Sequence, residues 1–266
     1  CSSDLARHWS SNGHPLRPCQ EDCDHYAALL DLGSRHALTS VILGVTPQLY
    51  SLPWPARSTV RAVDHSAGMI QRVWPGARGT ACRASWLDMP FPDESADCIV
   101  CDGGLNLLEF PFGLRRLAAG VAKTLNAGGS LVVRQFALPA EAETPAAVWD
   151  DFRAGLIPGL PVLKLRLGMA MQPSPDAGVV LGDVYAAVLE ECGSLDGLQR
   201  RSGWPHEDVR AFEAWNSRNR YHFTTMAQCI EAIESSSPLA FVRHLTGRYL
   251  LAERCPVLLF RKVGHR

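Results

Sequence analysis

One short stretch constrains the fold of this chain more than any other. Residues 41–43 form a continuous apolar run, as expected for a strand buried on both faces of a parallel sheet. Gly44 ends the run, while Thr46 and Pro47 suit the N-cap and the first position of a helix. The pattern therefore predicts a strand, a tight turn and a helix start, whose free amide groups suit an anionic group.

Strands and helices continue to alternate beyond this turn. A second strand at residues 60–63 ends in Asp64, and Ser66 can cap the helix that follows. In nucleotide-binding folds, an acidic residue at this spacing accepts hydrogen bonds from ribose hydroxyls. Further strand or helix patterns lie near 20–32, 80–85, 97–101, 112–125, 130–135, 239–245 and 256–263. The alternation predicts a parallel sheet with right-handed crossovers.

Four segments, in this order, carry a resemblance to a known family: LGVTPQL, AVDHSAGMI, ASWLDMPFPDESADCIVCDG and KTLNAGGSLVVRQF. They resemble class I S-adenosylmethionine (SAM) dependent methyltransferases over roughly residues 38–136, with a weaker echo over 221–263. The resemblance implies a doubly wound α/β fold with a seven-stranded, mostly parallel sheet whose last two strands are antiparallel. It also implies that the chain binds SAM, transfers its methyl group and releases S-adenosylhomocysteine.

The resemblance assigns cofactor contacts to particular residues. It implies that the backbone at Gly44 approaches the cofactor closely and that Asp64 accepts hydrogen bonds from both ribose hydroxyls. The full set of implied contacts is Gly44, Val45, Thr46, Pro47, Asp64, His65, Met69, Leu87, Asp88, Asp102 and Gly103. Several have an ordinary structural alternative: a turn residue for Gly44, Asp64, Asp102 and Gly103, a solvated loop residue for Asp88, and a core position for Met69.

Methyl transfer to a hydroxyl or a protonated amine also needs a base. The candidate bases are Asp102, His206, Tyr221 and His222. Tyr221 is the poorest of them in charge terms, because an unperturbed tyrosine has a pKa of about 10.

Two segments lie outside the recognised sheet. Residues 1–35 are expected to form an N-terminal lid, with Trp9 and Arg17 over the cofactor, unless Trp9 and Leu16 pack on the domain edge instead. Residues 137–223 are expected to form an insertion after the fifth strand. The insertion carries side chains that could line an acceptor pocket: Met169, Met171, Trp204, Phe212 and Trp215. The alternative is that these side chains pack a separate core.

The composition indicates which classes of partner and which compartment suit this chain. The net charge is −1 and no long run of Lys or Arg occurs, which argues against a nucleic acid as partner. No stretch approaches the roughly 20 apolar residues of a membrane span, and no signal-peptide pattern is visible. Nine cysteines in 266 residues are interpreted as reduced thiols of a cytoplasmic protein.

No metal site is predicted. Cys98 and Cys101 are three apart on a strand and so point to opposite faces. Cysteines and histidines also gather at positions 8–25, but no second pair completes a ligand set. Three functions remain open: a methyltransferase for a small-molecule acceptor, which the insertion favours; a protein or RNA methyltransferase; and a non-catalytic SAM-binding module. The oligomeric state also remains open.

Overall fold

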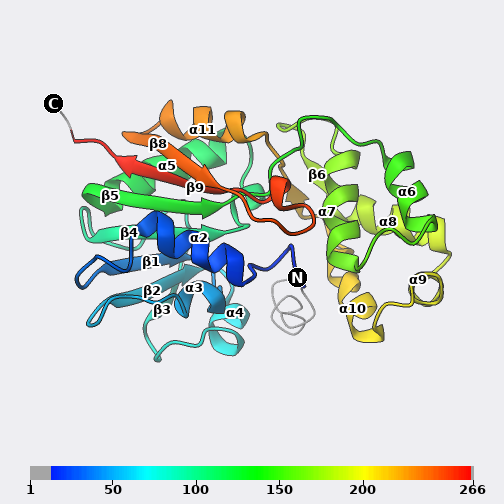
Figure 1. The fold of residues 1–266 in the computed structure, drawn as a ribbon, viewed down its shortest axis with the longest axis horizontal. Helices are drawn as coiled ribbons and strands as arrows, with labels where there is room; N and C mark the ends of the chain where they lie inside the picture. The colour runs from blue at the N-terminus through cyan, green and yellow to red at the C-terminus, as the bar shows by residue number, and fades with distance from the viewer. Residues whose placement is uncertain (1–12, 265–266) are drawn as a thin grey trace.

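A seven-stranded sheet forms the first of two lobes (Figure 1). The structure, a computed structural model, describes residues 13–264. The strand order is β3-β2-β1-β4-β5-β9-β8, with β1 to β5 parallel and β9 antiparallel to both β5 and β8. The strands are β1 Thr39–Leu43, β2 Thr59–Asp64, β3 Ala81–Arg83, β4 Ala96–Asp102, β5 Leu125–Arg134, β8 Leu239–Leu245 and β9 Val257–Lys262. The predicted sheet and its antiparallel final pair are confirmed.

Helices cover both faces of the sheet, as a doubly wound fold requires. On one face, α2 (Gln20–Leu30) and α3 (Pro47–Tyr50) pack against Ile42 and Val100. On the other face lie α5 (Phe112–Thr124) and α11 (Met226–Glu234), while α4 (Ala67–Arg72) connects β2 to β3. Ser66 caps α4, as predicted, and Thr225 caps α11. Cys98 and Cys101 belong to opposite cores, also as predicted.

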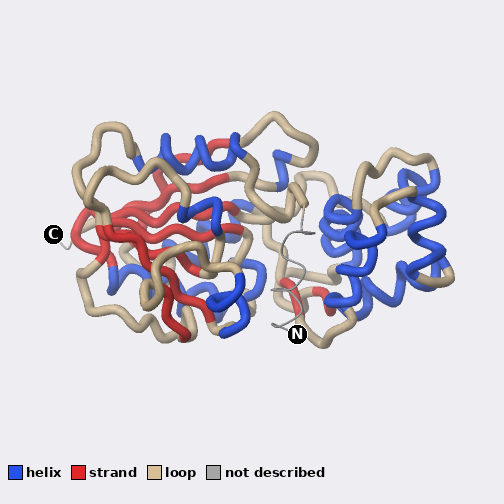
Figure 2. Tube along the Cα trace, turned by 90° about the horizontal axis from the view of Figure 1, so that it is seen from below, coloured by secondary structure: helices blue, strands red, loops and turns tan. Residues whose placement is uncertain are grey.

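The insertion forms a separate helical lobe at one end of the sheet (Figure 2). Its elements are α6 (Pro145–Arg153), α7 (Leu160–Met171), α8 (Leu181–Cys192), α9 (Leu195–Ser202), α10 (His206–Ala211) and η2 (Phe212–Trp215), with a short pair of strands, β6 (Val179–Val180) and β7 (Arg220–Tyr221). Most of the expected pocket-lining side chains are instead packed in this lobe's own core, namely Met169, Trp204, Phe212 and Trp215. Met171 packs against the same core from a partly buried position.

The core of the helical lobe also buries a lysine. Lys164 on α7 is 5% exposed, and its Nζ lies 4.8 Å from the ring centroid of Trp215. Burial lowers the pKa of Lys164 to about 7, because the ammonium form loses its hydration.

We expect this lysine to make folding stability depend on pH. An unfolded lysine keeps its proton up to about pH 10.4, so between pH 7 and 10 the unfolded chain binds more protons and stability rises with pH. Lys164→Met lacks this titrating group. From pH 7 to pH 9 the unfolding free energy of wild type should therefore rise by about 2 kcal/mol relative to that of the variant. Urea titrations at pH 7, 8 and 9 measure this difference. If the difference between the two proteins stayed constant over this range, Lys164 would not have a lowered pKa in the folded protein.

Within residues 13–264, every helix is too short or too polar to cross a bilayer.

Candidate cofactor site

The carboxyl ends of β1 and β2 bring Gly44 and Asp64 together. Gly44 follows β1 with φ of 89°, a left-handed conformation that favours glycine. A Cβ atom at Gly44 would lie 3.9 Å from Oδ2 of Asp64, the last residue of β2. The aspartate therefore turns its carboxylate toward the glycine turn of the neighbouring strand, as the spacing in the sequence predicts.

The Asp64 carboxylate is held in place by its surroundings. Asp64 is 7% exposed, and its Oδ1 accepts a hydrogen bond of 2.7 Å from the Ser66 amide. Burial raises the pKa of Asp64, while hydrogen bonds from the Ser66 and Val45 amides oppose that rise. His65 projects outward, 75% exposed, with its Nδ1 3.6 Å from Oδ1 of Asp64. In this environment Oδ2 faces the turn.

The residues after Gly44 enter the protein interior. Val45 and Met69 pack together in a small buried cluster, so the Met69 side chain fills a core position. Thr46 is buried at the N-cap of α3 and makes no side-chain capping bond, and Pro47 begins the helix. Any ligand contact at Val45 would therefore come from backbone atoms, because its side chain is 2% exposed.

The loop between β3 and β4 places Asp88 in a surface ion pair. Its carboxylate accepts a hydrogen bond of 2.8 Å from Arg116 on α5, and its side chain is 76% exposed. Leu87 packs, partly buried, on the core beneath α5.

Trp86, which precedes Leu87, contacts the strand ends, and the sequence patterns did not predict it as a site residue. Its Nε1 donates to the Val63 carbonyl at 2.8 Å. Its place directly after the predicted strand at residues 80–85 was the one sequence signal that could have indicated a site residue here.

Asp102 is the partner of a buried arginine. Its side chain is 3% exposed, and its two oxygens lie 2.5 Å from Nε and 3.2 Å from an Nη of Arg134, at the end of β5. Burial alone would lower the pKa of Arg134, but Asp102 raises it, so the guanidinium stays charged. Asp102 is therefore engaged as a counter-ion, which corrects its interpretation as a free base. Gly103, with φ of 60°, lies under the ring of Phe136.

The same arginine fixes the N-terminal segment to the sheet edge. The Pro15 carbonyl accepts a hydrogen bond of 2.8 Å from Arg134, and the Asp22 carboxylate lies 3.3 Å from it. The Tyr26 hydroxyl donates to the Cys101 carbonyl at 2.5 Å and accepts from the Arg134 amide at 2.8 Å. The segment from residue 13 onward is thus docked on β4 and β5. Trp9 lies outside the described residues.

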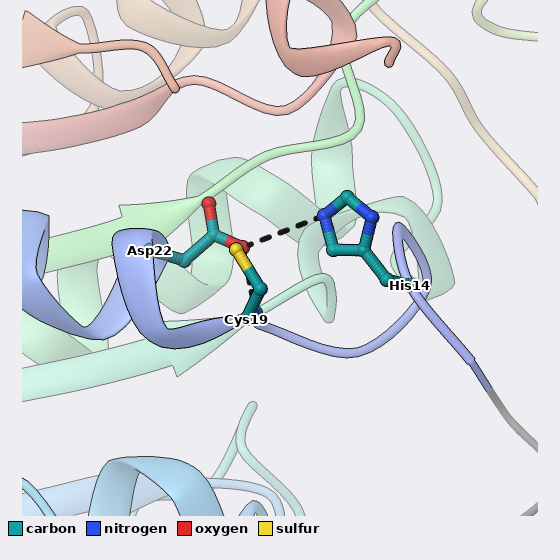
Figure 3. A group of neighbouring side chains, drawn as sticks. All are labelled: His14, Cys19 and Asp22. Carbon is teal, nitrogen blue, oxygen red and sulfur yellow. Dashed lines mark hydrogen bonds and ion pairs between the residues drawn. The ribbon is translucent and has the colours of Figure 1, made fainter. Parts of the chain in front are cut away.

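Figure 3 shows His14, Cys19 and Asp22, whose ligand atoms lie within 4.8 Å of one another. Oδ2 of Asp22 accepts from the Cys19 amide at 3.0 Å and lies 4.0 Å from His14 Nε2. The same oxygen lies 3.3 Å from an Nη of Arg134, so a cationic side chain already faces it.

The remaining base candidates are dispersed. His206 is exposed on α10, with its Nδ1 3.0 Å from Gln199 Oε1. Burial raises the pKa of Tyr221 to about 12, and its ring packs edge-on against Trp215. His222 is 8% exposed, and its Nδ1 lies 2.9 Å from the Pro175 carbonyl. Since a carbonyl only accepts, Nδ1 carries the proton and the neutral ring has Nε2 as its acceptor.

A small cavity of about 10 Å³ lies beside Gln135 and Phe136, which follow β5. It joins the segments that follow β4, β5 and β7, and it is lined by Leu105, Asn106, Leu108, Phe110, Leu114, Gln135, Phe136, His222 and Thr224. Two buried side-chain oxygens in its wall, Asn106 Oδ1 and Gln135 Oε1, have no hydrogen-bond partner among residues 13–264. The cavity thus has room for about one water-sized group and offers it two acceptors.

Comparisons with known proteins agree with this geometry. Residues 42–133 match the model of a family described as a methyltransferase domain. No curated protein sequence matches the chain.

Solved structures share the fold at low sequence identity. The putative methyltransferase in complex with the Haloferax volcanii Trm112 methyltransferase activator has a TM-score of 0.56 at 11% identity, covering 99% of this chain and 98% of that one. The N-methyltransferase NodS from Bradyrhizobium japonicum WM9, in complex with S-adenosylhomocysteine, has a TM-score of 0.51 at 12% sequence identity, and the match covers 98% of each chain. A SAM-dependent methyltransferase from Methanosarcina mazei has a TM-score of 0.51 at 12% sequence identity, and the match covers 93% of this chain and 99% of that one. Residues 42–133 thus match a methyltransferase domain, and the strand order is that of the class I SAM-dependent methyltransferase fold, with Gly44 and Asp64 paired at its strand ends.

Proposed function

We propose that this chain binds SAM at the carboxyl ends of β1, β2 and β4 and transfers its methyl group to a small-molecule acceptor. The observation that carries the proposal is the approach of the Asp64 carboxylate to the Gly44 turn, inside the matched methyltransferase domain. A protein of the same fold, NodS, was solved with S-adenosylhomocysteine bound, which supports the choice of cofactor.

Asp64 is the main polar contact for the cofactor. Its Oδ2 faces the turn, where it can accept charge-assisted hydrogen bonds from ribose hydroxyls. Gly44 lets the backbone come close to the ligand because it has no Cβ. His65, exposed beside Asp64, can lie along the adenine. The sulfonium of SAM makes the methyl electrophilic, so the protein's task is to align sulfur, methyl and acceptor and to exclude water.

The acceptor group is assigned to the cavity beside Gln135 and Phe136. Asn106 Oδ1 and Gln135 Oε1 need hydrogen-bond donors, so they favour an acceptor that carries N–H or O–H groups. His222 lines the same cavity, and its Nε2 can take the proton that such an acceptor loses. Because the cavity has room for about one water-sized group, it is assigned only the reacting N–H or O–H group of the acceptor.

We also propose a reducing cytoplasm as the compartment. Every cysteine in residues 13–264 is a free thiol, and cytosolic reductants maintain that state.

Titration calorimetry tests the proposed function. Purified protein should release or absorb heat on titration with SAM and with S-adenosylhomocysteine, saturating at one ligand per chain. A protein that is folded by circular dichroism yet gives no heat with either ligand would contradict it.

We expect Asn106→Leu to stabilise the protein by about 1 kcal/mol. The change is nearly isosteric, and it removes a buried acceptor that has no partner. The matched control is Asn126→Leu, whose amide donates to Asp97 at 2.8 Å; losing that bond should cost about 1–3 kcal/mol. Thermal and urea unfolding measure both values. A less stable Asn106→Leu would show that this oxygen is satisfied in solution, which removes the reason for assigning it to the acceptor.

A further inference from the structure

The Trp86 indole lies on the strand ends that the cofactor needs. A Cβ at Gly44, after β1, would lie 3.2 Å from Cζ2 of Trp86, and a Cβ at Gly104, after β4, would lie 2.6 Å from its Cη2. Its Nε1 bonds to the Val63 carbonyl at the end of β2. One ring therefore touches the carboxyl ends of β1, β2 and β4.

The two glycines form a cradle that this ring fills. At Gly104 an added Cβ would also meet Cys101 Sγ at 2.8 Å, so any side chain there would displace the indole. Aromatic carbon at these distances leaves no layer between ring and backbone for a ligand. A nucleoside placed against Gly44 and Asp64 would overlap the indole.

The contacts that hold the indole are few and replaceable. Trp86 is only partly buried, in the loop between β3 and β4. An indole has a single donor, so Nε1 to Val63 is its one conventional hydrogen bond. When the ring leaves, the Val63 carbonyl keeps a hydrogen bond of 2.8 Å from the Gly44 amide. Opening therefore leaves no buried backbone group unpaired.

We propose that Trp86 is a gate: it occupies the cofactor site in the ligand-free protein and must swing out of the Gly44–Gly104 cradle before SAM can bind. This inference rests on the proposed function. Only the molecules whose ring is out can bind cofactor. The apparent dissociation constant is therefore the intrinsic one divided by the fraction of molecules in that state. Minor states of this kind have populations of roughly 0.1–10%.

Cofactor binding to Trp86→Ala and Trp86→Phe tests the gate. S-adenosylhomocysteine should bind Trp86→Ala about 10-fold or more tighter than wild type and associate faster, as measured by calorimetry and stopped flow. Trp86→Phe should lie between the two, because the smaller ring still enters the cradle but loses the bond to Val63. The matched control is Trp149→Phe on α6, a partly buried tryptophan of the helical lobe that should bind like wild type.

Tryptophan fluorescence gives a second readout. Ligand should change the emission of wild type and of Trp149→Phe, and this change should be lost in Trp86→Phe. Equal or weaker affinity in Trp86→Ala, with wild type binding normally, overturns the gate alone. No binding by wild type or by either Trp86 variant, all folded, overturns the proposed function as well. Binding by Trp86→Ala alone supports the gate but overturns the proposed function of the wild-type chain.

Discussion

Arg134→Met is expected to destabilise the protein by about 3–5 kcal/mol, the loss usually seen when one partner of a buried ion pair is removed. Arg134, Asp22 and Asp102 are each at most 3% exposed at the side chain. Without the guanidinium, two carboxylates stay buried without a counter-ion, and the Pro15 carbonyl loses its donor. The loop around Pro15 should also loosen from the sheet edge, because its carbonyl is held by this side chain.

Urea unfolding and limited proteolysis of the N-terminal segment measure the effect. Arg116→Met is the matched control: its ion pair with Asp88 is exposed on both sides, so its free energy of unfolding should change by less than about 0.5 kcal/mol. Adding Asp102→Asn to Arg134→Met should recover part of the loss, because one buried charge disappears. If Arg134→Met unfolded at the wild-type midpoint, this arginine would not anchor the segment.

Asp64→Ala is expected to weaken S-adenosylhomocysteine binding by about 100-fold or more. Each charge-assisted hydrogen bond to a ribose hydroxyl contributes roughly 1.5–3 kcal/mol, and Asp64 can accept two. Calorimetric titration measures the loss directly.

Two variants separate binding from folding at this position. Asp64→Asn keeps an oxygen for the Ser66 amide but loses the negative charge, so it should fold normally and still bind weakly. Asp93→Ala, which removes an exposed partner of Lys123, should bind like wild type. Wild-type affinity in a folded Asp64→Ala protein would rule out the ribose role.

Local patterns in the sequence were sufficient for the sheet and for the Gly44–Asp64 pair. Apolar runs such as residues 41–43 mark buried strands, and a glycine or aspartate at their ends marks the carboxyl edge. Ser66 and Thr225 cap their helices because capping depends on neighbours within one turn. All of these signals are local in the chain.

Contacts between distant segments were beyond such patterns. Arg134 reads as an ordinary strand end, and only the fold brings it to Asp22 and Asp102, 112 and 32 residues away. Asp102 was named as a candidate base because the arginine that binds it is distant in the sequence. Trp86 could not be placed because the position of a loop side chain depends on the strand ends that it meets. In the helical lobe, Phe212 is apolar enough either for a pocket or for a core, and packing decides for the core.

A crystal structure of the chain with S-adenosylhomocysteine tests the central claim most directly. The account predicts the ribose hydroxyls within hydrogen-bonding distance of Asp64, the ligand against Gly44, and the Trp86 ring moved out of the cradle that it fills in the ligand-free protein. A ligand bound elsewhere, or one bound with the Trp86 ring still between Gly44 and Gly104, would contradict it.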